Sequence, residues 1–149
     1  MAVTTAVPHP YDPLSAKEME QAVGVVRAGQ AQRKSIKFPL IRLGLPEKEL
    51  VREFDPERPI PRVAFLVVYD PEAGAMFEAR VDLTDDSLVS WEHLPGMQPP
   101  IMIEELMALD EIIKGDPAAV EALKRHGVED LSQVQFDPWS TGTLPIEGV

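Results

Sequence analysis

The stretch VAFLVVY at residues 63–69 constrains the fold of this chain more than any other feature of its sequence. In an extended strand, successive side chains point to opposite faces of the sheet. Both sets of alternating residues are apolar here: Val63, Phe65, Val67 and Tyr69 on one face, and Ala64, Leu66 and Val68 on the other. A strand that is apolar on both faces is typical of the centre of a sheet. We therefore expect residues 63–69 to form a central strand.

A helix is predicted before this strand. Residues 15–18 (Ser-Ala-Lys-Glu) form a capping box, in which the Ser15 hydroxyl and the Glu18 carboxylate each satisfy a free backbone N–H. Apolar residues then recur at the spacing of one helical face: Met19, Ala22, Val23 and Val26. Gly29 is the predicted end of the helix, because glycine is common after the last helical turn.

Further strands are predicted on both sides of residues 63–69. A strand is predicted from Ser35, because Lys37 and Pro39 alternate with the apolar residues Ile36, Phe38 and Leu40. Pro39 indicates that it is an edge strand or contains a bulge. Residues 47–54 favour another short strand. Residues 77–83 alternate between apolar and charged side chains, and residues 88–94 form a last strand with Val89, Trp91 and His93 on one side. The turns lie at 70–74 and 84–87.

The second half of the chain is predicted to be mainly helical. The first helix ends at Gly115, and its apolar stripe consists of Ile103, Leu106, Met107 and Ile113. The second helix starts at Asp116-Pro117, an N-cap residue followed by proline, and ends at His126-Gly127. Val120 and Leu123 form its apolar side. One short strand is expected around residues 134–136. About 50 residues rarely bury enough surface to form a domain alone, so we expect this half to be incomplete.

The composition excludes several classes of function. A formal net charge of −11 disfavours nucleic acid and anionic membranes as partners. The chain has no cysteine, which excludes disulfides, thiolate metal sites and thiol catalysis. The first residues, MAVTTAVPHPYDP, lack the basic and apolar regions of a secretory signal. We expect a soluble cytoplasmic protein.

No set of residues has the spacing of a catalytic or metal site. His9, His93 and His126 are too far apart in the sequence to form a spaced ligand pair. Glu104 and Glu105 are adjacent on a helix and point about 100° apart, so they cannot act as a carboxylate pair. Trp91 and Trp139 are expected to be core or interface anchors. We therefore assign no catalytic, cofactor-binding or metal-binding residue to this chain.

Several stretches, in order, resemble one family, the copper-containing amine oxidases. The segment HPYDPLSAKEMEQAVGVVR resembles the opening of these oxidases, a His-Pro-x-Asp-Pro-Leu-Ser/Thr lead into a helix. FEARVDL (77–83), Ser90-Trp91 and LPGMQP (94–99) resemble the end of that domain and its link to the next. Gly127-Val128, Asp130-Leu131-Ser132 and DPWSxG (137–142) resemble a stretch of the second small domain.

The resemblance implies a cystatin-like α+β fold, a helix packed on a four- to five-stranded antiparallel sheet. It implies an arm at residues 1–13, a first small domain at 14–95, and a linker with the helical start of a related, incomplete second domain at 96–149. The enzymes of this family are homodimers that oxidise primary amines to aldehydes and release ammonia and hydrogen peroxide, so the resemblance implies this activity for the full-length enzyme. Its copper and topaquinone belong to a catalytic domain that we expect to be missing here.

None of the family's catalytic residues can be placed on this sequence. The topaquinone precursor is a Tyr that follows Asn, whereas Tyr11 and Tyr69 follow Pro10 and Val68. We expect the chain to be a non-catalytic amino-terminal region of such an oxidase, inactive alone and without its own cofactor. The alternative is a freestanding cystatin-like protein-interaction module without enzymatic activity. A third hypothesis, that the chain itself binds copper and oxidises amines, is disfavoured by the lack of ligands.

Overall fold

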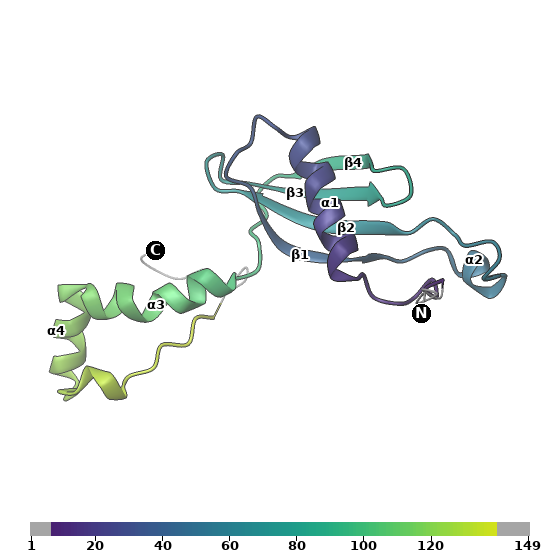
Figure 1. The fold of residues 1–149 in the computed structure, drawn as a ribbon. Helices are drawn as coiled ribbons and strands as arrows, with labels where there is room; N and C mark the ends of the chain where they lie inside the picture. The colour runs from purple at the N-terminus through teal and green to yellow at the C-terminus, as the bar shows by residue number, and fades with distance from the viewer. Residues whose placement is uncertain (1–6, 140–149) are drawn as a thin grey trace, which may run out of the picture. The chain divides into compact units, whose positions relative to one another are not determined.

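The computed structural model describes residues 7–139. The chain divides into two compact units, Met1–Pro100 and Ile101–Val149, which we call the amino-terminal and the carboxy-terminal unit. Figure 1 shows the ribbon of both. Each unit is described by itself below.

The amino-terminal unit is an α+β structure, as expected from the sequence. Helix α1 (Ala16–Gly29) precedes four strands, β1 (Lys37–Gly44), β2 (Val63–Asp70), β3 (Ala75–Asp82) and β4 (Ser87–Leu94). The strands are antiparallel neighbours in the order β1-β2-β3-β4, a simple meander (Figure 1). The capping box of Ser15 and Glu18 starts α1 and Gly29 is its last residue, which confirms the predicted helix.

The core of this unit lies between α1 and one face of the sheet. Ala22 and Val26 of α1 are fully buried against the inner face of β2, whose Ala64, Leu66 and Val68 are also fully buried. Phe77, Ala79 and Val81 of β3 complete the layer. Strand β2 pairs with β1 on one side and β3 on the other, so its predicted central position is confirmed.

The other face of β2 belongs to a second, smaller cluster. Phe65 and Val67 lie there with Met76 of β3 and Leu94 of β4. The Arg42 guanidinium lies over the Phe65 ring, 4.3 Å from its centroid. We call this side of the sheet, turned away from α1, the open face. Both faces of β2 are therefore apolar and buried, as its sequence indicates.

Strand β1 is an edge strand with a bulge, as Pro39 indicates. The register shifts between Lys37 and Leu40, so the alternation of side chains is interrupted there. Beyond the shift, Ile41 packs against the main core while Leu40 is 40% exposed. The expectation that Leu40 shares the core face with Ile36 and Phe38 was therefore wrong, because the extra residue reverses the alternation.

Strand β4 is the opposite edge and also has an irregular register. Val81 pairs with Leu88 and the preceding Arg80 with Ser90, so Val89 is the additional residue. Leu88 packs against the core and Val89 is 60% exposed. Val89, expected on the same side as Trp91, is the extra residue of the bulge and does not pack against the core with Trp91. Bulges at both edges are a common way to limit edge-to-edge pairing.

The segment expected as a short strand around residues 47–54 is helical instead. Helix α2 covers Lys48–Arg52. The segment EKELVR is rich in residues with good helix propensity and has no clear alternation of apolar and polar residues, since Leu50 and Val51 are adjacent. The sheet accordingly has four strands, the lower of the two numbers expected.

The carboxy-terminal unit contains two helices as predicted. Helix α3 (Ile103–Gly115) ends at Gly115, and α4 (Pro117–Arg125) starts at Asp116, whose carboxylate accepts from the N–H groups of Ala118 and Ala119. The strand expected at residues 134–136 is not present; instead a short 3-10 helix, η1 (Leu131–Gln133), precedes irregular chain up to residue 139. None of these three helices contains a buried residue.

Candidate functional site: the Arg62 cluster

The three histidines do not form a metal site. His9 precedes α1, His93 lies in β4 opposite Phe77, and His126 caps the end of α4. Within residues 7–139, no group of three or more His, Cys, Asp or Glu side chains is placed to hold a metal ion. The donor set of this part of the chain therefore does not fit copper, which needs about three such ligands within reach.

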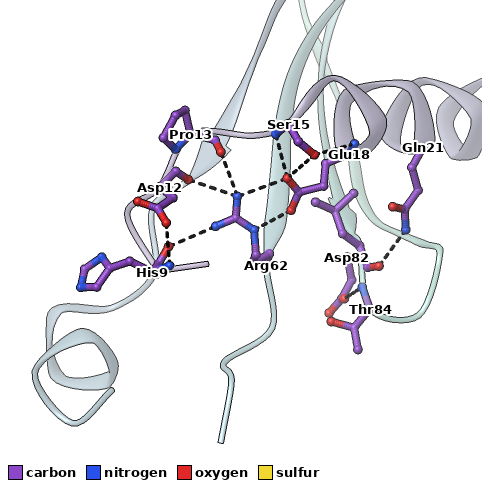
Figure 2. Close-up of polar contacts among 10 residues, drawn as sticks. His9, Asp12, Pro13, Ser15, Glu18, Gln21, Arg62, Asp82 and Thr84 are labelled. Carbon is purple, nitrogen blue, oxygen red and sulfur yellow. Dashed lines mark hydrogen bonds and ion pairs between the residues drawn. The ribbon is translucent and has the colours of Figure 1, made fainter. Parts of the chain in front are cut away.

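The most extensive polar arrangement surrounds Arg62, directly before β2 (Figure 2). Its Nε donates to Glu18 Oε1 at 2.6 Å, and one terminal nitrogen donates to the other Glu18 oxygen at 3.4 Å. The same terminal nitrogen also donates to the backbone carbonyls of Asp12 and Pro13, at 3.1 and 3.2 Å. The other terminal nitrogen donates to the His9 carbonyl at 3.3 Å. One guanidinium thus joins residues 9–13 to the first turn of α1.

The arm between His9 and Pro13 has its own local structure. The His9 N–H donates to the Asp12 carboxylate at 2.7 Å, and the Asp12 N–H donates back to the His9 carbonyl at 2.8 Å. The His9 ring packs edge-on against Phe54, with the ring centroids 5.4 Å apart. These contacts turn the carbonyls of the arm toward Arg62, where they act as acceptors.

Glu18 is the negatively charged partner of Arg62 in this cluster. Partial burial of its carboxyl group opposes ionisation, but bonds donated by Arg62 and by the backbone and hydroxyl of Ser15 outweigh burial. The pKa of Glu18 is therefore held below its ordinary value. A lowered pKa means that the folded chain favours the carboxylate form, so this ion pair stabilises the fold at neutral pH.

A second link lies in the same region of the sheet. The Gln21 amide donates to the Leu83 carbonyl and to the Asp86 carboxylate, both at 2.7 Å. A pocket of about 290 Å³ lies beside Gln21, Leu83 and Arg62. Its lining also includes Lys17, Glu18, Ile60 and Thr84. Its volume is at the lower end of the range for ligand sites, about 300–1,000 Å³.

The geometry limits what Arg62 can do chemically. All three guanidinium nitrogens already donate to acceptors of the protein. No pair of parallel donors is left to take a substrate carboxylate or phosphate in the bidentate manner that makes arginine a ligand-binding residue. The cluster therefore works as a structural clasp that fixes the arm onto the sheet and helix.

A second ion pair supports the opposite end of α1. Arg33 follows the helix, and its guanidinium donates to Asp70 at the end of β2 while lying 4.5 Å from the Phe77 ring centroid. Burial raises the pKa of the Asp70 carboxyl, but bonds from Arg33 and from the N–H groups of Ala73 and Glu72 lower it by more. The net pKa of Asp70 is below its ordinary value.

The aromatic residues singled out in the sequence have different roles. Trp91 stacks on Phe77 with their centroids 4.6 Å apart and packs against the core, as expected. Trp139 is 83% exposed and donates to the Asp137 carboxylate, so it is not a core residue in the described structure.

Glu105, one of the two adjacent glutamates, has a capping role. Its carboxylate accepts from the Met102 N–H at the start of α3.

Comparison with known proteins identifies the family. The family model described as copper amine oxidase, N2 domain, matches residues 9–94, which include the arm, α1, the sheet and Arg62. The matched region starts at the first residue of the Arg62 cluster and ends at the last residue of β4. The chain belongs to the copper amine oxidase family.

Individual relatives agree with this assignment. A primary amine oxidase of an Arthrobacter species is 35% identical over 137 residues, covering 91% of this chain and 21% of that protein. A copper amine oxidase-like protein of Schizosaccharomyces pombe is 35% identical over 139 residues, covering 89% of this chain and 17% of that protein. This chain spans about a fifth of the length of these relatives.

A solved structure shows the same fold. It is that of a copper-containing benzylamine oxidase from Hansenula polymorpha, which is 19% identical, with a TM-score of 0.67. The similarity covers 81% of this chain and 20% of that one.

Each helix within residues 7–139 is too short or too polar to span a bilayer.

Proposed function

We propose that this chain is a non-catalytic, amino-terminal structural region of a copper amine oxidase. The single observation that carries the proposal is the family match over residues 9–94, combined with relatives of which the chain covers about a fifth. The amine oxidation itself, with its copper and topaquinone, then belongs to a catalytic domain outside this chain. In that enzyme, primary amines are converted to aldehydes with release of ammonia and hydrogen peroxide.

The described residues support a structural role. Arg62 uses its donors within the chain, and the histidines do not gather into a set that fits copper. We propose that residues 1–13 are an arm, 14–95 a cystatin-like first domain, and 96–149 a linker with the start of a related, incomplete second domain. The proposal includes a cytoplasmic, homodimeric parent enzyme without nucleic-acid or membrane partners, and no catalytic or cofactor-binding residue in this chain.

The experiment is an activity assay on the purified chain after incubation with copper. Oxygen uptake is measured with methylamine and benzylamine, together with the visible absorbance of a protein-bound quinone. The proposal predicts no amine-dependent oxygen uptake and no quinone absorbance. Turnover that depends on both amine and copper would contradict it, and reading the coding DNA beyond Val149 would show directly whether a catalytic domain follows.

The alternative function is that of a freestanding cystatin-like module that binds another protein through its sheet. One observation favours it: both faces of β2 are apolar. A stable monomer that forms a complex with a defined partner would favour this function, and an aggregating or partly unfolded chain would favour a structural region of a longer enzyme.

A further inference from the structure

The methionines of this chain differ sharply in their exposure to solvent. The chain has no cysteine, so methionine supplies all of its sulfur, and five of the six methionines lie within residues 7–139. Met76 and Met102 are buried, at 6% and 7% exposed, and Met19 packs against the main core. Met97 and Met107 are 59% and 73% exposed. The fold thus shields some of its thioether groups and presents two of them to solvent.

Met97 is held in a tight turn directly after β4. Its N–H donates to the Leu94 carbonyl at 3.4 Å, which closes a four-residue turn over Pro95 and Gly96. Gly96 has a φ of 72°, a conformation that glycine adopts freely, and proline at the preceding position is typical of such a type II turn. The turn therefore fixes the backbone at Met97 while its side chain stays more than half exposed.

Met107 lies on α3, four residues after Ile103. Residues at this spacing share one face of a helix, and Ile103 is itself 66% exposed. Helix α3 contains no buried residue, so this face is open to solvent in the described structure. Met107 is consequently the most exposed of the five described methionines.

We propose that Met97 and Met107 are sites of reversible oxidation by hydrogen peroxide. The thioether sulfur attacks one peroxide oxygen, and an S–O bond forms as the O–O bond breaks. The second oxygen takes up the proton of the first and leaves as water. Sulfur is oxidised by two electrons to the sulfoxide while the peroxide is reduced, and methionine sulfoxide reductases restore the thioether.

The position of these methionines makes their oxidation harmless to the fold. A sulfoxide is polar, so it disrupts packing when it forms inside a core. Met76 lies in the smaller core cluster, whereas Met97 and Met107 belong to neither cluster of the described residues. The two exposed side chains can therefore consume peroxide repeatedly while the core stays intact. Amine oxidation would supply that peroxide in the parent enzyme, and this source rests on the proposed function.

Peptide-resolved mass spectrometry of the whole chain in excess hydrogen peroxide tests the proposal. The two exposed methionines should oxidise about tenfold faster than Met76 and Met102, because the exposed fractions differ by about that ratio. In urea, where the fold is lost, the four rates should converge. After the fast reaction, circular dichroism and the urea unfolding midpoint should be unchanged. A mixture of the reductases for the two sulfoxide epimers should then return both peptides to their original mass.

The matched control is the double variant Met97→Leu and Met107→Leu. Leucine keeps the size and apolar character of both side chains but has no sulfur. The variant should lose the fast reaction, and its Met76 and Met102 should oxidise at the parental rates.

Three results would overturn the proposal: equal rates for exposed and buried methionines in the folded chain, a fast reaction at only one of the two sites, or unfolding during the fast reaction. The peroxide is added in this experiment, so these outcomes do not depend on amine oxidation. Failure of the proposed function would leave them unchanged.

Discussion

The two units of this chain have equally clear helix signals in their sequences, but among the described residues, 7–139, only the amino-terminal unit has a hydrophobic core cluster. In the amino-terminal unit, α1 buries Ala22 and Val26 against the sheet. In the carboxy-terminal unit, α3 and α4 start and end where their caps predict, yet neither helix has a buried residue. Large apolar side chains of α3 are exposed: Ile103, Leu106, Met107 and Ile112.

Capping and periodicity thus determine where a helix forms, whereas a core needs a second layer. Helix α1 has such a layer in the four-stranded sheet. Helices α3 and α4 have mainly each other within residues 101–139. Two short helices bury too little surface to offset the conformational entropy of ordering their chain. We expect the folding stability of the molecule to reside in the amino-terminal unit.

The largest effect is expected from truncating a core side chain. Leu66→Ala removes a fully buried side chain from β2 and should lower the free energy of unfolding by about 2–5 kcal/mol. Urea unfolding followed by the fluorescence of Trp91 measures this, in a Trp139→Phe background that removes the only other tryptophan. The matched control is Leu106→Ala in α3, where Leu106 is 43% exposed. Equal shifts from both substitutions would remove the contrast between the units.

The next effect is expected at the clasp. Arg62→Gln leaves Glu18 and three carbonyls of the arm without their donor and should cost about 2–3 kcal/mol. Arg62→Lys keeps the charge but not the planar fork, so an intermediate loss is expected. The control is Lys114→Gln, which breaks the partly exposed pair with Asp110 within α3 and should cost about 0.5 kcal/mol or less. Faster proteolysis of the arm in Arg62→Gln alone would identify the clasp as its anchor.

Acid should destabilise the amino-terminal unit through two carboxylates. The pKa values of Glu18 and Asp70 are below their ordinary values, so both groups contribute stability at neutral pH. This contribution begins to be lost near pH 4, about the pKa of the unfolded groups, and is gone below the lowered folded values. Glu18→Gln and Asp70→Asn should each reduce the slope of stability against pH below about pH 4.5.

Asp130 in the carboxy-terminal unit is the control for this pH dependence. Bonds from Ser132 and Gln133 lower its pKa as well, but the group is fully exposed. Asp130→Asn should therefore leave the acid transition reported by Trp91 unchanged. If it altered that transition as much as Asp70→Asn, the two units would unfold together.

The smallest effects are expected from the helix caps. Ser15→Ala removes the acceptor that starts α1 and should cost about 1 kcal/mol in the unfolding of the amino-terminal unit. Asp116→Ala removes the equivalent acceptor of α4 and should reduce helical circular dichroism without moving the Trp91 transition. A shift of that transition by Asp116→Ala would show that α4 contributes to the stability of the sheet.

Local signals in the sequence were sufficient for most of the secondary structure. The capping box at Ser15 and the Asp116-Pro117 start predicted helix ends correctly because the interactions involved lie within four residues. The prediction for residues 47–54 was wrong because the mixed pattern there does not indicate a strand, whereas the helix propensity of its residues is high. The predicted face of Leu40 was wrong because it depends on the position of the extra residue in the bulge. That position is set by the register of β1 with β2.

The Arg62 cluster could not have been found from sequence reasoning. Its partners lie 44 to 53 positions earlier in the chain, and no local motif marks an arginine that precedes a strand as the donor to those acceptors. The contact of Arg42 and Arg80 with Phe65 on the open face likewise depends on register, because the three residues come from three strands and meet only in the folded sheet.

The most direct test of the contrast between the units is amide hydrogen exchange of the whole chain, resolved by peptide mass spectrometry. We expect strong protection in α1, β2 and β3, close to that expected from global unfolding, because these elements share one core. We expect fast exchange in α3 and α4, which have no buried residue. Protection in α3 and α4 equal to that of β2 would contradict the contrast between the units, because it would require a second layer over those helices.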